Sequence, residues 1–261
     1  MSNSETRIPD DAWGPLLGSL TLVFGLFQGL AHALGSERGQ AGLVIAAAVI
    51  GALVVVECLL FRHTPTTALR TLGLGRPAAI GALVALGVGL LLLAVIPAYA
   101  ALRGATLSSY PGWPWLLPGL FAQSGIAEET LFRGCLFRHL RRGRSFWHAA
   151  ALAAVPFVVV HLFLFATMPW QVALAAVLLA TALSFPLAHL FELGGKTIWA
   201  PALMHCIVQG AIKVVEVPGD TTLALAWMGA SGVFPYLVFL FQRPIAGKMC
   251  GGSSQRGTTT D

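Results

Sequence analysis

Long blocks of apolar residues run through the chain, and short stretches rich in Gly, Pro and Arg separate them. Each block is close to the roughly 20 residues that a helix needs to cross a bilayer. The blocks lie near residues 14–35, 41–61, 78–101, 117–138, 146–166, 170–191, 197–215 and 222–241. The pattern therefore predicts an all-α fold, namely a polytopic membrane bundle of about eight transmembrane helices.

The composition of the chain supports this fold class. Hydrophobic residues make up 56% of the 261 residues and charged residues only 10%, against about 25% charged residues in soluble proteins. No polar stretch is long enough to fold alone, so we expect one integral-membrane domain over residues 1–261, with polar tails at 1–13 and 244–261. The net charge of +5 comes from arginines between the apolar blocks, which indicates membrane topology rather than nucleic-acid binding.

The basic residues also predict an orientation. With eight spans, both tails and every second loop fall on one side of the membrane, and that side holds twelve Lys and Arg against three on the other. The twelve are Arg7, Arg62, Arg70, Arg76, Arg138, Arg141, Arg142, Arg144, Lys196, Arg243, Lys248 and Arg256, and the three are Arg38, Arg103 and Lys213. The positive-inside rule then places both termini in the cytoplasm. The first span follows acidic rather than basic residues, so we expect it to remain as an anchor.

The polar stretches between the blocks carry three smaller predictions. Residues 66–76 are too polar and too short to span, so they are expected to lie along the cytoplasmic surface. Trp113 and Trp115 are expected at the outer interface as an aromatic anchor. The low-complexity tail, residues 251–261, is expected to be disordered.

Four cysteines are scattered along the chain, and their spacing is not that of a metal site. They are Cys58, Cys135, Cys206 and Cys250, and three of them lie in apolar blocks. We interpret them as small buried side chains and expect no metal and no cofactor. Acylation of Cys250 is conceivable in the polar tail, but the chain lacks a C-terminal CaaX ending.

Two acids and an arginine interrupt the apolar block at 117–138. A charge near the bilayer centre costs at least a few kcal/mol, so it persists only if it is paired, hydrated or used. Glu129 and Arg133 are four residues apart on a helix, in the favourable order for an ion pair. Glu128 points roughly 100° further round. The spacing therefore predicts a structural carboxylate at Glu129 and a chemically available one at Glu128. Glu57, the other acid within a span, lies one turn from the cytoplasmic end, where we expect it to reach water.

Four histidines also lie within the predicted spans, and a single histidine in a helix is usually a hydrogen-bonded packing residue. His161 lies one turn after Phe157, on the same face of its helix. His205 lies one turn before Gln209, so an imidazole and a carboxamide can offer two donors to one oxygen, as an oxyanion site requires. An alternative role for this pair is polar contact between helices. The other two histidines, His32 and His189, lack such partners and are interpreted as structural.

Three motifs resemble those of the CPBP family of intramembrane glutamic endopeptidases, which includes the Rce1-type CAAX prenyl proteases and many bacterial ABI-type proteins. The family's two glutamates followed by an arginine are matched by Glu128, Glu129 and Arg133. Its Phe and His four residues apart are matched by Phe157 and His161. In the third motif His205 is kept, whereas Gln209 replaces the family's Asn. The resemblance covers about residues 66–215.

The resemblance implies a role for each matched residue. Glu128 and His161 would activate a water molecule, and His205 with residue 209 would bind the oxyanion. Glu129 and Arg133, beside Phe157, would support the site. Gln209 carries the same amide group as Asn, on a side chain longer by about one bond, and catalysis is sensitive to displacements of about 1 Å.

The sequence therefore predicts an intramembrane endopeptidase that acts on a membrane-anchored protein or peptide substrate in the lipid bilayer. Among the activities of the family, processing of C-terminal tails, as by the myxosortases, is placed first, ahead of peptide maturation. The alanine- and arginine-rich composition with few lysines suggests a high-GC bacterium, and hence its inner membrane. Two alternatives stay open. One carboxylate and two histidines could form the zinc site of a metalloprotease, although no His-Glu-x-x-His motif is present. The chain could also be a non-catalytic transporter or bacteriocin immunity factor that uses the Glu129–Arg133 pair for architecture.

Overall fold

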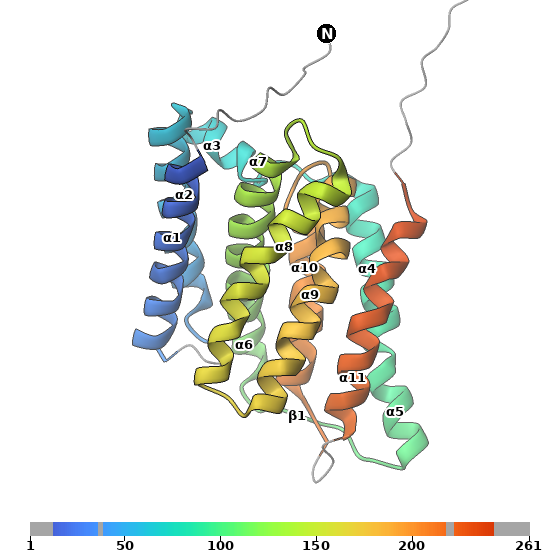
Figure 1. Ribbon diagram of the computed structural model, residues 1–261. Coiled ribbons are helices and arrows are strands. Elements are labelled where there is room, and N and C mark those ends of the chain that lie inside the picture. Colours follow the sequence, from blue (N-terminus) through green and yellow to red (C-terminus); the bar gives the residue numbers. More distant parts are fainter. Residues whose placement is uncertain (1–12, 36–38, 218–221, 243–261) are drawn as a thin grey trace, which may run out of the picture.

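The computed structural model describes residues 13–35, 39–217 and 222–242. Nearly all of this part is helical, and the helices run side by side as an antiparallel bundle (Figure 1), which confirms the all-α prediction. The polar tails, apart from Trp13 at the inner edge of the first, lie outside the described residues, as do Cys250 and residues 251–261.

The described residues contain eleven α-helices, which make up most of the bundle. They are α1 (Trp13–Ala33), α2 (Gly42–Phe61), α3 (Pro65–Thr71), α4 (Ala79–Leu93), α5 (Val95–Arg103), α6 (Trp113–Leu120), α7 (Arg138–Arg141), α8 (Phe146–Leu162), α9 (Trp170–Leu193), α10 (Trp199–Val214) and α11 (Thr222–Val233). Two π-helical segments and two 3-10 segments in the same residues connect or follow them: η2 (Phe121–Ala127), η3 (Thr130–Phe137), η4 (Phe163–Ala166) and η5 (Phe234–Leu240). Two short strands, β1 (Ser108–Ser109) and β2 (Val215–Glu216), pair antiparallel at one end of the bundle.

Six stretches within the described residues are long and apolar enough to cross a membrane. They are Trp13–Ala33, Gly42–Phe61, Ala79–Arg103, Phe146–Ala166, Trp170–Leu193 and Thr222–Leu240. The two other predicted spans are the ones that carry most of the motif residues. One becomes α10, which has only 16 residues, and the other is divided among α6, η2, η3 and α7. The number eight therefore stays a prediction.

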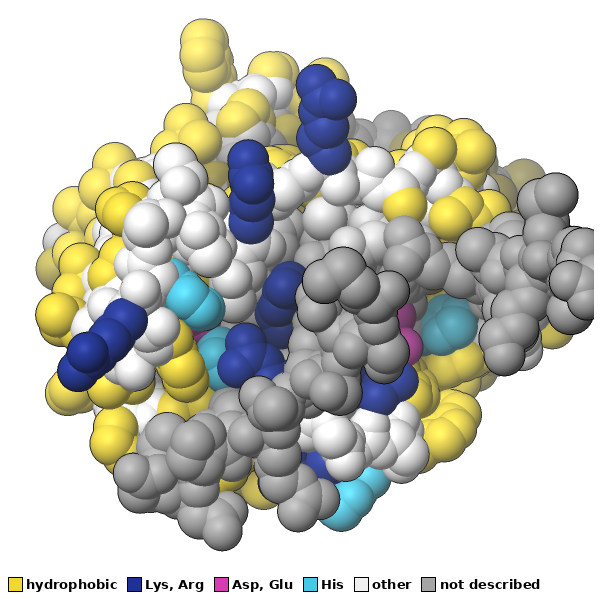
Figure 2. All heavy atoms as spheres, turned by 90° about the horizontal axis from the view of Figure 1, so that it is seen from above, with side chains coloured by type: hydrophobic (Ala, Val, Ile, Leu, Met, Phe, Trp, Pro, Cys, Tyr) yellow, Lys and Arg dark blue, Asp and Glu magenta, His cyan; other side chains and the backbone are white. Residues whose placement is uncertain are grey.

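The connections of the bundle separate into two ends. The start of α1 and the end of η5 lie at the same end as α3 and α7, whereas α5 and the β1–β2 pair lie at the opposite end (Figure 1). Figure 2 looks onto the first of these ends and shows several Lys and Arg side chains gathered there. The loops at this end belong to the side that is predicted from the sequence to hold most of the Lys and Arg residues.

Helix α3 begins with a side-chain cap and a proline in its first turn. The Thr64 hydroxyl accepts a hydrogen bond from the backbone N–H of Thr67, and Pro65 occupies the first turn. The segment does not lie wholly on the surface, because Leu72 after it is fully buried. Its carbonyl oxygen lies against Gly134, where an added Cβ would come within 2.1 Å. A glycine at position 134 therefore lets the end of this segment pack directly on the backbone that carries the acidic motif.

Two clusters of buried apolar residues hold the bundle together. One joins α1, α2, the motif segment and α8, and the other joins α4, α9, α10, α11 and η5. The outer faces are also apolar, as the exposed Leu22, Leu59 and Leu102 illustrate. A bundle that is apolar both inside and outside is expected to sit in lipid, so the few polar side chains in its interior mark the candidate site.

Candidate active site

The two glutamates of the first motif lie at the junction of the π-helical segments η2 and η3. The backbone N–H of Glu128 donates to the carbonyl of Gln123, five residues back, and that of Arg138 donates to Arg133 in the same way. An α-helix would use the carbonyl four residues back. π-Helical turns are rare and often occur at functional sites. Gly125 in η2 comes close to the backbone of α10, since an added Cβ would lie 2.9 Å from the Ala202 carbonyl oxygen.

Glu129 is the centre of a buried polar cluster. Its Oε1 accepts a hydrogen bond from Arg133 Nη1 at 3.0 Å, so the ion pair expected from their spacing is present. The same oxygen is 2.7 Å from Nδ1 of His205, on α10. Glu129 is 0% exposed, and Arg133 and His205 are also buried. The acid therefore joins the first motif to the third, a contact between residues 76 positions apart that the sequence did not predict.

Phe157 forms an aromatic wall beside this cluster. The guanidinium carbon of Arg133 lies 4.3 Å from the centre of the Phe157 ring, within range for a cation–π interaction. The rings of His161 and His205 lie 4.8 Å and 6.2 Å from the same ring, centre to centre. The first residue of the second motif thus contacts one residue from each of the three motifs.

Gln209 contacts His205 directly, because its Nε2 lies 2.8 Å from Nε2 of the imidazole. When His205 Nδ1–H donates to Glu129, a neutral ring carries a lone pair at Nε2, which accepts from the amide of Gln209. The two groups therefore bond to each other here, whereas the sequence interpretation had both pointing at a third atom. The result is a chain of hydrogen bonds that runs from Arg133 through Glu129 and His205 to Gln209.

A cavity of about 730 Å³ opens beside the cluster, and all four predicted catalytic residues line it, namely Glu128, His161, His205 and Gln209. The rest of its wall is mostly apolar and comes largely from α9 and α11, with smaller contributions from α1, α8 and α10. The side chain of Glu128 is 16% exposed, and its Oε2 lies 3.8 Å from His205 Nε2. His161 has its Nδ1 2.7 Å from the carbonyl oxygen of Phe157, so its Nε2 is the ring nitrogen left for other contacts.

The other two histidines and the third acid of the predicted spans lie in different surroundings. His189 Nε2 lies 2.9 Å from the Phe241 carbonyl oxygen and its ring packs on Phe239, which suits the structural interpretation. His32 lies exposed on α1. Glu57 is fully buried and bound to His63 Nδ1 at 2.9 Å, so the expectation that it reaches water directly is wrong. Its carboxylate oxygens lie near side chains of the adjoining turn and of η3.

The fold and the site define a polytopic α-helical membrane protein with carboxylate, imidazole and amide groups around an internal cavity. Residues 110–211 match the family described as "Type II CAAX prenyl endopeptidase Rce1-like". This match confirms the resemblance to the CPBP and CAAX protease family, and it covers all three motifs. Searches of curated proteins and of solved structures found no match.

Proposed function

We propose that this chain is an intramembrane endopeptidase in which Glu128 and His161 activate a water molecule. The family match supports a membrane-embedded peptidase of the CAAX type. One observation carries the more specific proposal. Of the two adjacent acids, Glu128 lines the cavity with His161, whereas Glu129 is buried with Arg133. The geometry therefore gives the neighbouring carboxylates different surroundings, as different roles require.

In the proposed reaction the carboxylate of Glu128 accepts a proton from water while the water oxygen attacks the carbonyl carbon of the peptide bond. His161 orients this water through Nε2, because Nδ1 is held by the Phe157 carbonyl. The carbonyl oxygen becomes an oxyanion in the tetrahedral intermediate. Collapse of the intermediate breaks the C–N bond, and the proton held by Glu128 passes to the leaving amine, either directly or through Nε2 of His161.

We assign binding of the oxyanion to His205 and Gln209. The amide of Gln209 has two N–H groups, and while one donates to His205 Nε2 the other is available for a substrate oxygen. His205 donates directly only when its Nε2 carries a hydrogen, and otherwise it holds the amide in place. The buried Glu129 holds the imidazole through its Nδ1, and Arg133 in turn holds Glu129. Preorganised donors of this kind stabilise developing charge because they need not reorient during the reaction.

The substrate is proposed to be a membrane-anchored protein or peptide, cleaved in its C-terminal region. The mostly apolar cavity suits a segment with long apolar side chains. A bacterial inner membrane is the proposed location. For the metalloprotease alternative, the described residues contain one group of three close metal-capable side chains, and it lies away from the cavity.

The function is tested by comparing protein termini in cells that produce either the wild type or the Glu128→Gln variant. We expect a set of C-terminal fragments that appears only with the wild type, because the variant lacks the proton acceptor. Both proteins must reach the membrane at equal abundance, which an immunoblot of the membrane fraction checks. Identical termini in the two samples, with full biological effect of the variant, would favour a non-catalytic transporter or immunity factor.

The proposed orientation has both termini in the cytoplasm and is tested with reporters. A reporter that is active only in the cytoplasm is expected to be active when it is fused after Arg142, beyond α7. A reporter that is active only after export is expected to be active when it is fused at Ser108, in β1 at the opposite end of the bundle. The reverse pattern at both sites contradicts the orientation, although it leaves the bundle itself unaffected.

A further inference from the structure

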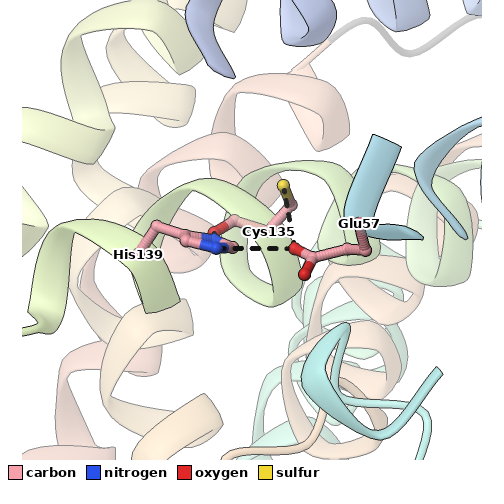
Figure 3. Close-up of side chains that lie close together, drawn as sticks. All are labelled: Glu57, Cys135 and His139. Atoms are coloured by element: carbon pink, nitrogen blue, oxygen red, sulfur yellow. Dashed lines mark hydrogen bonds and ion pairs between the residues drawn. The ribbon is translucent and has the colours of Figure 1, made fainter. Parts of the chain in front are cut away.

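A second cluster of polar side chains is buried at the end of the bundle that holds α3 and α7. It consists of Glu57 on α2, Cys135 on η3 and His139 on α7, all fully buried. Figure 3 shows the thiol of Cys135 and the ring of His139 both directed at the carboxylate of Glu57. Glu57 Oε1 lies 3.9 Å from Cys135 Sγ and 3.5 Å from His139 Nε2. None of these residues lines the cavity described above.

The hydrogen bonds of His139 indicate what its second nitrogen offers. Nδ1 lies 2.8 Å from the carbonyl oxygen of Cys135, which can only accept, so Nδ1 carries the hydrogen. In the neutral ring the lone pair is therefore at Nε2. Among the described residues no hydrogen-bond partner reaches this buried atom. Its lone pair faces a carboxylate oxygen, and two electron-rich atoms in this arrangement favour a cation between them.

We propose that Glu57, Cys135 and His139 bind a zinc ion. Carboxylate oxygen, thiolate sulfur and imidazole nitrogen are the three donor types that zinc uses in proteins. In a tetrahedral site the donor atoms lie about 3.3 to 3.6 Å apart, from metal–ligand distances of about 2.0 to 2.3 Å. Here two of the separations are 3.5 and 3.9 Å, and all three atoms lie within 4.8 Å of one another. Small side-chain rotations would complete the site.

Charge balance supports zinc over a monovalent ion. On binding, the Cys135 thiol releases its proton to water and becomes a thiolate. The thiolate and the Glu57 carboxylate together then carry two negative charges, which a divalent ion neutralises. A neutral assembly is what a buried site in an apolar bundle tolerates, since an uncompensated charge there costs several kcal/mol.

His63 positions the carboxylate and connects the cluster with the surface. Its Nδ1 is 2.9 Å from Glu57 Oε2, and its side chain is 25% exposed. It therefore turns Oε1 toward the other two ligands, as outer partners of metal ligands commonly do. A water molecule that entered past His63 would fill the fourth position on the ion, because the cluster supplies three ligands. The ring of Phe61, 4.4 Å from that of His139, covers another side.

The position of this cluster defines what the ion would do. Its ligands come from α2 and from the end of the same helical run that carries Glu128 and Glu129. A zinc ion would fasten these two parts of the bundle together and would stabilise the active-site backbone without touching the substrate. The proposal is therefore a structural zinc site, and its test does not depend on the proposed peptidase activity.

The test uses the full chain purified in detergent without metal-affinity steps, stripped with a chelator and then titrated with Zn²⁺ or Co²⁺. We expect one Zn²⁺ per chain by elemental analysis and a rise in Tm. Co²⁺ is expected to give the near-ultraviolet charge-transfer absorption of a cobalt–thiolate bond. Cys135→Ser should lose this absorption and the Tm rise, whereas Cys206→Ser, a cysteine on α10 outside the cluster, should keep both.

His63→Ala provides a second variant at a partly exposed position, in case Cys135→Ser fails to fold. It is expected to weaken zinc affinity by about 10- to 100-fold and to keep the cobalt–thiolate absorption, since an outer partner is lost while all three ligands remain. A wild-type chain that binds no stoichiometric Zn²⁺ and shows no thiolate absorption would overturn the proposal and leave a hydrogen-bonded cluster only. Equal zinc binding by wild type and Cys135→Ser would overturn it as well.

Discussion

Replacing Glu129 by glutamine is expected to destabilise the protein strongly, whereas replacing Glu128 by glutamine is expected to spare the fold and abolish cleavage. Glu129 is 0% exposed, and its Oε1 accepts from both Arg133 and His205. A neutral amide there leaves the buried guanidinium without its counter-charge, a loss of roughly 3 to 5 kcal/mol. Glu128 instead faces the cavity with a partly exposed side chain, so its neutral isostere removes the proposed base and little packing.

The two variants form a matched pair, because the same chemical change is made at adjacent positions. Thermal unfolding in detergent measures the first effect, and cleavage of a substrate identified from the comparison of termini measures the second. Glu129→Gln should show a clear fall in Tm and reduced yield, while Glu128→Gln should unfold like the wild type. Similar losses of Tm in both variants would contradict the division of roles. An active Glu128→Gln enzyme would remove the proposed base.

Local spacing accounts for what the sequence predicted well. The apolar blocks became helices because a membrane span must satisfy its backbone within one segment. The Glu129–Arg133 pair followed from a four-residue spacing, and it survives in the structure although the backbone around it is π-helical rather than α-helical. That backbone form was not predictable, because it accompanies close packing such as that of Gly125 on α10, which no local pattern encodes.

Long-range contacts account for what the sequence missed. The bond between Glu129 and His205 joins residues 76 positions apart, and Glu57 is separated from Cys135 by 78. One local signal was available, since Cys135 and His139 are four residues apart and therefore share a helix face. The third residue, Glu57, comes close to them only in the folded protein, where α2 lies beside η3. The interpretation of the cysteines as small buried side chains rests on their spacing and on the apolar blocks that hold three of them.

The proposed zinc site changes how a chelator experiment should be interpreted. Loss of activity on chelation would ordinarily indicate a catalytic metal. Here it would also follow if removal of a structural ion loosened the helix that carries Glu128. The two cases differ in the variant Cys135→Ser, which lacks the structural ion from the start. If the ion acts through stability, Cys135→Ser should already show the lower activity and Tm of the chelated wild type, and the chelator should change neither further. If a separate metal is catalytic, the variant should be active and should lose its activity on chelation.

Replacing Gln209 by leucine is expected to lower the turnover rate by roughly 100-fold or more, the usual effect of removing one oxyanion donor. Leucine has a similar size and no donor. KM should change little, because the bond to the substrate oxygen forms mainly in the transition state. The amide also lies 2.8 Å from His205 Nε2, so thermal unfolding must be measured alongside to show that the fold survives. Initial rates over a range of substrate concentrations separate kcat from KM.

Gln209→Asn is the control that tests whether this site is adapted to its longer side chain. Asparagine restores the residue type of the family but withdraws the amide by about one bond, and reactions at such sites are sensitive to displacements of about 1 Å. If the present contact with His205 Nε2 positions the donor, Gln209→Asn should fall between the wild type and Gln209→Leu in kcat. A wild-type rate in Gln209→Leu would mean that His205 or a backbone N–H serves the oxyanion alone, and the role proposed for Gln209 would then be withdrawn.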